Sequence, residues 1–267
     1  GLDLQQIDHA VSAVDIALWD MIGKHLNEPI YRLIGYDKAY GKLPYASVLF
    51  GDTPEETRSI AQSIVADGFR AAKFGWGPIG QGSADDDVAF VAAARDGLGP
   101  TTKLMVDAGV AWGADDATAY DRAKRFAEYD LTWLEEPLLP KEVGAYRRLL
   151  DRHPPVAIAA GEGSDYYRAA DDLMVNGKIN YIQIDVGRTG GISICDAICR
   201  RAQELDIQYV NHTFKSHLQL AASLHVFAGV QQFSLMEYPV GNSPLILGVT
   251  EPTGLPVAAD GLVHCPD

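Results

Sequence analysis

Leu131-Thr132-Trp133-Leu134-Glu135 is an apolar run of strand length that ends in a carboxylate, and this arrangement recurs along the chain. Seven strand-like segments end in, or just beyond, an ionisable residue: Lys73, Asp107, Glu135, Glu162, Asp185, His212 and Glu237. From Asp107 onward the spacing is 23 to 28 residues, about one strand plus one helix. That period is typical of a (β/α)₈ barrel, which carries its chemistry at the carboxyl ends of the strands. The pattern predicts an active site to which each strand contributes one residue.

Strands and helices are expected to alternate after an opening helix at Ile7 to Leu26. Strands are predicted at 43–49, 69–74, 103–107, 131–135, 156–161, 180–185, 207–211 and 233–237, and helices at 54–67, 84–97, 115–129, 141–151, 164–175, 190–205 and 216–229. This order favours an α/β fold with a parallel, closed sheet of the TIM type. A doubly wound open sheet would need a glycine-rich phosphate turn after its first strand, and Leu49-Phe50-Gly51-Asp52 is not one. No eighth helix is predicted.

Composition narrows the class of partner. The 267 residues suffice for one large barrel or two small domains. A net charge of −14 argues against nucleic acid, and no apolar run approaches the roughly 20 residues that cross a membrane. Three cysteines do not make a disulfide framework, so we expect buried, reduced thiols at Cys195 and Cys199 and a cytoplasmic location. The start at Gly1 does not resemble a native N-terminus, so a targeting segment is not excluded.

Three consecutive predicted strands end in acids, at Asp107, Glu135 and Glu162. Neighbouring strand ends in a barrel are close enough for three carboxylates to share one ion. Oxygen ligands without Cys or His suit a hard cation, Mg²⁺ or Mn²⁺. Glu136 follows Glu135 directly, and successive strand residues face opposite ways, so only one of them can face the metal. Strand parity alone does not choose between the two.

The next two predicted strands end in Asp185 and His212, a pair expected of a general base. Lys73, from the second strand, would face this pair with the substrate between them, and Glu237 completes the ring. The alternative for Lys73 is a side chain extended out of the rim. Gly187-Arg188-Thr189-Gly190-Gly191 is a weak phosphate-site signal and more simply permits tight packing. His217 and His225 are interpreted as structural.

Taken together, these residues resemble the mandelate racemase subgroup of the enolase superfamily. The resemblance covers nearly the whole chain. It rests on Trp133-Leu134-Glu135-Glu136-Pro137, Ala159-Ala160-Gly161-Glu162, Asp185-Val186-Gly187-Arg188-Thr189-Gly190-Gly191 and Asn211-His212-Thr213. The opening helix, from Ala13 to Lys24, looks like the last helix of that family's capping domain.

The resemblance implies a (β/α)₇β barrel and assigns roles to the strand-end residues. Residues 1–40 would end an otherwise missing N-terminal α+β capping domain, 41–240 would form the catalytic barrel, and 241–267 an irregular tail returning toward the cap. Asp107, Glu135 and Glu162 would bind Mg²⁺, His212 and Asp185 would form the base dyad, and Glu237 would sit beside the substrate carboxylate. A small carboxylate substrate, no nucleic acid or membrane partner, and a homo-oligomer between dimer and octamer are expected.

The sequence departs from the family pattern at two positions. Where the family often has a second lysine on strand two, this chain has Gly75, and where Asn often follows the first metal ligand it has Gly109. The role of Lys73 as base, acid or electrostatic partner stays open. Racemisation needs a competent proton donor on each face of the substrate, whereas dehydration can proceed with one good base and an acid for the leaving group.

Loss of the second lysine therefore favours a lyase that dehydrates a sugar acid through an enediolate. A racemase or epimerase of a 2-hydroxy acid is the alternative, and cycloisomerase chemistry, which relies more on paired lysines, is less favoured. From another class, a catalytically silent relative could bind metal and a sugar acid as a sensor. Proton exchange in D₂O distinguishes the enzyme from the sensor.

Overall fold

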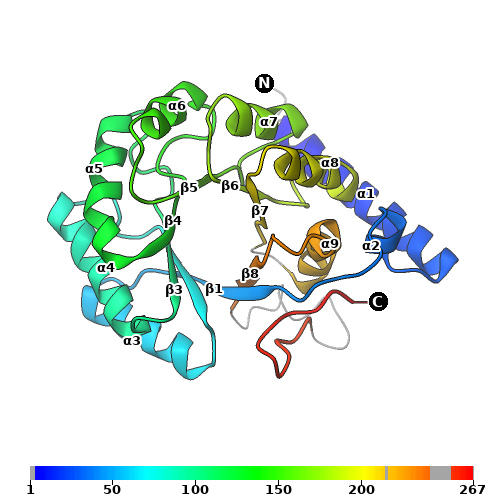
Figure 1. Ribbon diagram of the computed structural model, residues 1–267, viewed down its shortest axis with the longest axis horizontal. Coiled ribbons are helices and arrows are strands. Elements are labelled where there is room, and N and C mark those ends of the chain that lie inside the picture. The colour runs from blue at the N-terminus through cyan, green and yellow to red at the C-terminus, as the bar shows by residue number, and fades with distance from the viewer. Residues whose placement is uncertain (1–3, 214–215, 241–253, 267) are drawn as a thin grey trace. The chain divides into compact units, whose positions relative to one another are not determined.

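Strands and helices alternate along the chain in the computed structural model, which describes residues 4–213, 216–240 and 254–266 (Figure 1). The described elements are α1 (Leu4–Leu26), α2 (Ile30–Leu33), β1 (Leu43–Leu49), α3 (Pro54–Ala66), β2 (Ala71–Gly75), α4 (Ala84–Leu98), β3 (Lys103–Asp107), α5 (Asp116–Phe126), η1 (Ala127–Tyr129), β4 (Leu131–Glu135), α6 (Val143–Asp151), β5 (Ile158–Ala160), α7 (Tyr167–Val175), β6 (Tyr181–Ile184), α8 (Gly191–Glu204), β7 (Gln208–Asn211), α9 (His217–Phe227) and β8 (Leu235–Pro239). Part of the predicted tail, 241–253 and 267, lies outside the described residues.

The strands form one eight-stranded sheet in the order β7-β6-β5-β4-β3-β2-β1-β8. The pairs from β1–β2 through β4–β5 are parallel. Their register is level at the carboxyl ends, since Gly75 pairs with Asp107, Asp107 with Glu135, and Glu135 with Ala159. The predicted parallel α/β architecture is therefore confirmed, and the register places strand-end side chains at the same height.

Contacts divide the chain into two compact units. The terminal unit comprises the described residues of 1–44, 161–171 and 182–267, and the central unit comprises 45–160 and 172–181. In the central unit the helix starts carry the expected caps. The Thr53 side chain accepts a hydrogen bond from the Glu56 N–H, and Ser83 and Asp86 form a capping box. The largest fully buried side chains of this unit include Trp133, Tyr45 and Phe74.

In the terminal unit, α1 packs against α8. The Trp19 Nε1 donates a hydrogen bond to Ser193 Oγ at 2.9 Å, and the Ser193 N–H donates to Asp15 Oδ2 at 3.1 Å. A Cβ on Gly191 would lie 2.3 Å from Asp15 Oδ2, so this contact requires a glycine. Residues 42 and 263 form an isolated antiparallel bridge, which ties the described end of the tail to the segment before β1.

Six turns that lead from a helix into the next strand share one backbone feature. Each contains a residue with a left-handed φ between 50° and 87°: Gly68, Gly99, Asp130, His153, Lys178 and Asp206. A left-handed residue lets the chain reverse directly after the last helical turn. Two of these six are glycine, and the other four carry side chains.

Several predicted boundaries were wrong by a few residues. Strand 233–237 begins two residues later, at Leu235, and helix 115–129 ends as an α-helix at Phe126, where a 3₁₀ turn and left-handed Asp130 follow. Helix 164–175 begins only at Tyr167. Cys195 and Cys199 are buried free thiols, as expected. Within the described ranges, no helix is both long and apolar enough to span a membrane.

Candidate active site

The central unit brings three of the predicted site residues together. Asp107 and Glu135 are the last residues of β3 and β4, and Lys73 extends from the neighbouring β2. The Lys73 Nζ donates to Glu135 Oε1 at 2.6 Å and lies 3.9 Å from Asp107 Oδ2. All three side chains are almost fully buried, with residue exposures of 3%, 4% and 0% for Lys73, Asp107 and Glu135.

The prediction placed Lys73 at the end of its strand. Lys73 instead lies two residues before the end, because strand pairing continues to Gly75, which lies opposite Asp107. Its side chain pairs with two acids of the central unit. Buried carboxylates that lie this close together are oxygen donors of the kind that suit a hard divalent cation.

Glu135, and not Glu136, shares the side of the sheet that Lys73 occupies. The two oxygens of Glu135 have separate partners, since Lys73 holds Oε1 and the Trp133 indole N–H donates to Oε2 at 2.9 Å. Glu136 leaves the strand with a left-handed φ of 38°, and its N–H donates to the Ala159 carbonyl. Of the two glutamates, Glu135 is the one that lies beside Lys73.

Both departures from the family pattern lie where there is little space. A Cβ on Gly75 would meet Asp107 Oδ2 at 3.1 Å, tighter than ordinary van der Waals contact, so a side chain there would press on the carboxylate. A Cβ on Gly109 would meet the Trp76 ring at 3.3 Å, and Gly109 has a left-handed φ of 55°. The Gly109 N–H also donates to Asp107 Oδ1 at 2.8 Å.

The terminal unit contains the predicted base. His212 follows β7 directly, and its Nδ1–H donates to Asp185 Oδ2 at 2.8 Å. The second Asp185 oxygen accepts from the Gly187 N–H at 2.7 Å and from Gln219 Nε2 at 2.5 Å. The carboxylate is therefore fixed through both oxygens, which in turn fixes the orientation of the imidazole and leaves its Nε2 to face other groups.

That Nε2 lies among acids of the same unit. It is 3.2 Å from Glu162 Oε2 and 4.0 Å from Glu237 Oε2. Burial disfavours the charged imidazolium, but the charge of Glu237, the hydrogen bond to Asp185 and the charge of Glu162 outweigh it and raise the pKa of His212 to about 9. The group is a strong base by the standards of histidine, whose ordinary pKa is near 6.5.

Glu162 and Glu237 reach this cluster in different ways. Glu162 lies two residues beyond β5, after Gly161, whose φ is 123° and whose Cβ would meet Gln183 O at 2.9 Å. Arg188 Nη1 lies 3.5 Å from Glu162 Oε1. Glu237 lies in the middle of β8 and not at its end, contrary to the prediction. Its Oε2 accepts from the Thr213 N–H at 2.6 Å, which orients the carboxyl group toward the base.

Sequence reasoning missed two supporting residues, Trp133 and Gln219. The Trp133 position carried a signal, because it precedes Glu135 by two residues on the same face of a strand. Gln219 had none, since it lies 34 residues from Asp185 and meets it only through the packing of α9.

The two histidines of α9 have structural partners. His217 Nδ1 accepts from the Leu255 N–H at 2.8 Å, and His225 Nδ1 accepts from the Tyr31 N–H at 3.4 Å.

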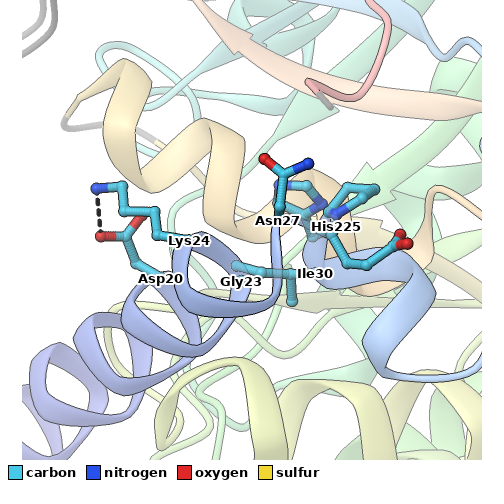
Figure 2. A pocket seen from close by; sticks show the side chains of 8 residues that line it. Asp20, Gly23, Lys24, Asn27, Ile30 and His225 are labelled. Carbon is cyan, nitrogen blue, oxygen red and sulfur yellow. Dashed lines mark hydrogen bonds and ion pairs between the residues drawn. The ribbon is translucent and has the colours of Figure 1, made fainter.

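Figure 2 shows a pocket at the turn between α1 and α2 to which His225 contributes, together with Asp20, Gly23, Lys24, Asn27, Glu28, Pro29 and Ile30. None of the seven predicted site residues lines it. In the Gly187 to Gly191 turn, Gly191 packs closely against Asp15, and the Gly187 N–H donates a hydrogen bond to Asp185 Oδ1.

Two family models match the chain. The enolase C-terminal domain-like model matches residues 56–267, and the N-terminal domain model of mandelate racemase and muconate lactonizing enzyme matches residues 4–35. Among solved structures, a predicted mandelate racemase from Rhodobacter sphaeroides is 43% identical with a TM-score of 0.94, covering 99% of this chain and 68% of that one. An enolase from Bradyrhizobium, complexed with magnesium and mandelic acid, is 28% identical with a TM-score of 0.83, covering 98% and 67%.

The curated relatives include a cycloisomerase and sugar-acid dehydratases. D-galactarolactone cycloisomerase of Agrobacterium fabrum is 31% identical over 83% of this chain, and L-talarate/galactarate dehydratase of Salmonella typhimurium is 28% identical over 89% of it. The chain spans 58% of the length of each. These matches confirm the predicted fold class, a TIM-type barrel preceded by a segment, residues 4–35, that matches part of the N-terminal domain model. The chain belongs to the enolase superfamily, in its mandelate racemase group.

Proposed function

We propose that the protein abstracts the proton α to a carboxylate with the help of Mg²⁺ and then eliminates a β-hydroxyl, so that it dehydrates a sugar acid. The observation that carries the proposal is the His212–Asp185 dyad, in which the imidazole Nε2 faces acids while its Nδ1 is fixed at 2.8 Å from Asp185 Oδ2. In this proposal residues 41–240 form the catalytic domain and residues 1–40 end a capping domain, in line with the matched family models.

Asp107, Glu135 and Glu162 are the proposed ligands of the ion. Each of the three can offer a carboxylate oxygen, and the solved Bradyrhizobium relative contains magnesium. Their all-oxygen chemistry suits Mg²⁺ in preference to a soft metal, and Mn²⁺ has similar requirements. When bound, the ion would supply positive charge that stabilises the negative charge developing on the substrate carboxylate.

His212 takes the α-proton on Nε2 in the proposed mechanism. Asp185 keeps the proton on Nδ1 and stabilises the imidazolium that forms, and Gly187 and Gln219 hold Asp185 in place. Glu237 lies 4.0 Å from the same Nε2 and serves as a hydrogen-bonding acid beside the substrate carboxylate. Lys73 adds a positive charge close to Glu135 and Asp107. These groups remove the proton from one face of the substrate, and the protonated His212 would then give it to the departing β-hydroxyl, which leaves as water.

Elimination is preferred to racemisation because position 75 is a glycine next to Asp107 and does not supply a second lysine. Relatives of both the dehydratase and the cycloisomerase type match this chain at about 30% identity, so cycloisomerisation is the second candidate. A dehydratase releases a 2-keto-3-deoxy acid from an open-chain substrate, whereas a cycloisomerase needs a lactone or an anhydro ring.

The deciding experiment incubates the protein with Mg²⁺ and a library of hexonates, pentonates, aldarates, lactones and anhydro sugar acids in D₂O. Semicarbazide detects keto acids, and NMR detects exchange of the α-proton. We expect a keto acid from at least one open-chain acid. In His212→Asn, both turnover and exchange should fall by about 10²-fold or more, with ligand binding retained.

Other outcomes would assign the chemistry elsewhere. Inversion at the α-carbon without keto acid would indicate a racemase, and turnover of lactones or anhydro acids alone would indicate a cycloisomerase. Exchange that survives in His212→Asn but disappears in Lys73→Met would make Lys73 the base. Binding without exchange or turnover for any acid would favour a sensor.

A further inference from the structure

The Trp133 indole is a polar partner of the Glu135 carboxylate with which a metal ion would not compete. Its Nε1–H donates to Glu135 Oε2 at 2.9 Å, while the Lys73 ammonium donates to Oε1 at 2.6 Å. An indole N–H is an uncharged donor and cannot accept. The ammonium is a cation, so an incoming cation competes with it for Oε1. The two oxygens of Glu135 therefore differ in their donors before an ion binds: Oε1 bonds to a cation and Oε2 to a neutral N–H.

Packing holds the indole where it is. Trp133 is fully buried. Its ring packs edge-on against Tyr45, at 5.5 Å between centroids, and at a tilt against Tyr181, at 4.8 Å. All of these residues belong to the central unit. Because the ring is enclosed by two aromatic side chains, releasing Oε2 would leave the indole N–H buried without its partner, which costs roughly 1–3 kcal/mol.

We infer that Trp133 is a positioning residue that keeps Glu135 a one-oxygen ligand and thereby makes the site selective for Mg²⁺ over Ca²⁺. Mg²⁺ requires six ligands in near-ideal octahedral geometry, which a single carboxylate oxygen serves well. Ca²⁺ accepts more ligands and takes carboxylates through both oxygens. A carboxylate whose second oxygen is held by an indole is unsuited to the two-oxygen mode. The inference rests on the proposed metal site.

The test compares Mg²⁺ and Ca²⁺ dissociation constants by calorimetry in the absence of substrate. Trp133→Phe keeps an aromatic ring and removes the N–H. We expect its Kd for Mg²⁺ to rise by about 10-fold or more, the usual effect of losing a hydrogen-bond partner of a metal ligand. The Kd for Ca²⁺ should rise less or fall, so that the ratio of the Mg²⁺ to the Ca²⁺ constant increases at least about fivefold.

Trp112→Phe is the matched control, because Trp112 is a buried tryptophan of the same unit that lies against Arg122. It should leave the ratio unchanged. If Trp133→Phe does not fold, 3-benzothienylalanine at position 133 replaces it, since that side chain keeps the shape of the double ring and lacks only the N–H. A parent-like ratio in the folded variant overturns the inference.

Glu135→Gln separates this inference from the proposal beneath it. If Glu135→Gln loses Mg²⁺ binding but Trp133→Phe keeps both affinity and selectivity, the metal site stands and the role of Trp133 is wrong. If Glu135→Gln binds Mg²⁺ like the parent, Glu135 is not a ligand and both fail. A change in Mg²⁺ affinity with an unchanged ratio would show that the ring matters only for packing, which also contradicts the inference.

Discussion

The side-chain amide of Asn211 bonds to both the N–H and the C=O of Glu237, in the way that the backbone of a neighbouring strand does. Asn211 Oδ1 accepts from the Glu237 N–H at 2.9 Å, and Asn211 Nδ2 donates to the Glu237 carbonyl at 3.2 Å. Asn211 ends β7 and Glu237 lies in β8, the two strands at opposite ends of the sheet order. The Asn211 side chain thus ties β8 to the end of β7, directly before the proposed base His212.

Asn211→Leu should destabilise the protein by about 2–4 kcal/mol, because it removes two buried hydrogen bonds to the backbone of Glu237. Urea unfolding followed by circular dichroism measures the loss. Asn176→Ala is the control, since Asn176 bonds to Asp172 on an exposed helix end and should cost under about 0.5 kcal/mol. A loss below about 1 kcal/mol in Asn211→Leu would contradict the pairing.

Glu162→Gln should weaken Mg²⁺ binding while leaving the fold intact, since it removes one ligand charge. Calorimetry gives the affinity, and circular dichroism checks the fold. Chelation should abolish turnover of the parent, and added Mg²⁺ should restore it. Glu204→Gln, which alters a carboxylate on the exposed end of α8, should behave like the parent. Glu162 is not a ligand if its amide variant binds the ion as well as the parent does.

In the metal-free protein the pKa of His212 is raised to about 9, so the imidazole is protonated at pH 7. Asp185→Asn removes a hydrogen bond and a charge that favour the imidazolium, and the pKa should therefore fall. Mg²⁺ added to the parent should lower it as well, because positive charge near Glu162 opposes protonation. NMR titration of the histidine ring signals measures both shifts. Asp171→Asn, which alters the partner of Arg201, should leave the signal unchanged.

His225 should make the fold sensitive to mild acid. Burial lowers its pKa from 6.5 to about 4, so the unfolded chain binds a proton at pH 5 that the folded protein does not. Stability from this group is present above pH 6.5 and is lost as the pH falls through 4, by up to about 3 kcal/mol.

Comparing the urea midpoint at pH 7 and pH 5 tests this expectation. The drop should be smaller in His225→Gln than in the parent, whereas the matched exposed variant His264→Gln should show the parental drop. Equal drops in all three proteins would remove His225 as the cause.

The order of elements and the strand-end acids were predictable because both follow from local sequence. Asp107 and Glu135 end their strands as predicted, since each closes an apolar run before a loop. Partners contributed by distant segments were not predictable. Gln219 reaches Asp185 from a helix 34 residues away, and Lys73 turns to Glu135 because strand register places β2 two strands from β4. Glu237 was misplaced within its strand because Phe233 and Ser234 are apolar or small enough to extend the pattern backward, although β8 begins at Leu235.

The left-handed turns that precede the strands offer positions at which this chain could be stabilised. At Asp130, His153, Lys178 and Asp206 a side chain occupies a left-handed backbone conformation. This costs roughly 1–2 kcal/mol each, of which a glycine would recover the part that exceeds its own loss of about 0.5–1 kcal/mol of chain entropy. The four turns are separate, so glycine replacements there should combine almost independently. They lie before the strands, whereas the chemistry follows them. Substitutions at the carboxyl ends of the strands that change substrate specificity usually lower the stability of the fold. Glycines in these four turns would offset that loss of stability without contacting a reacting group.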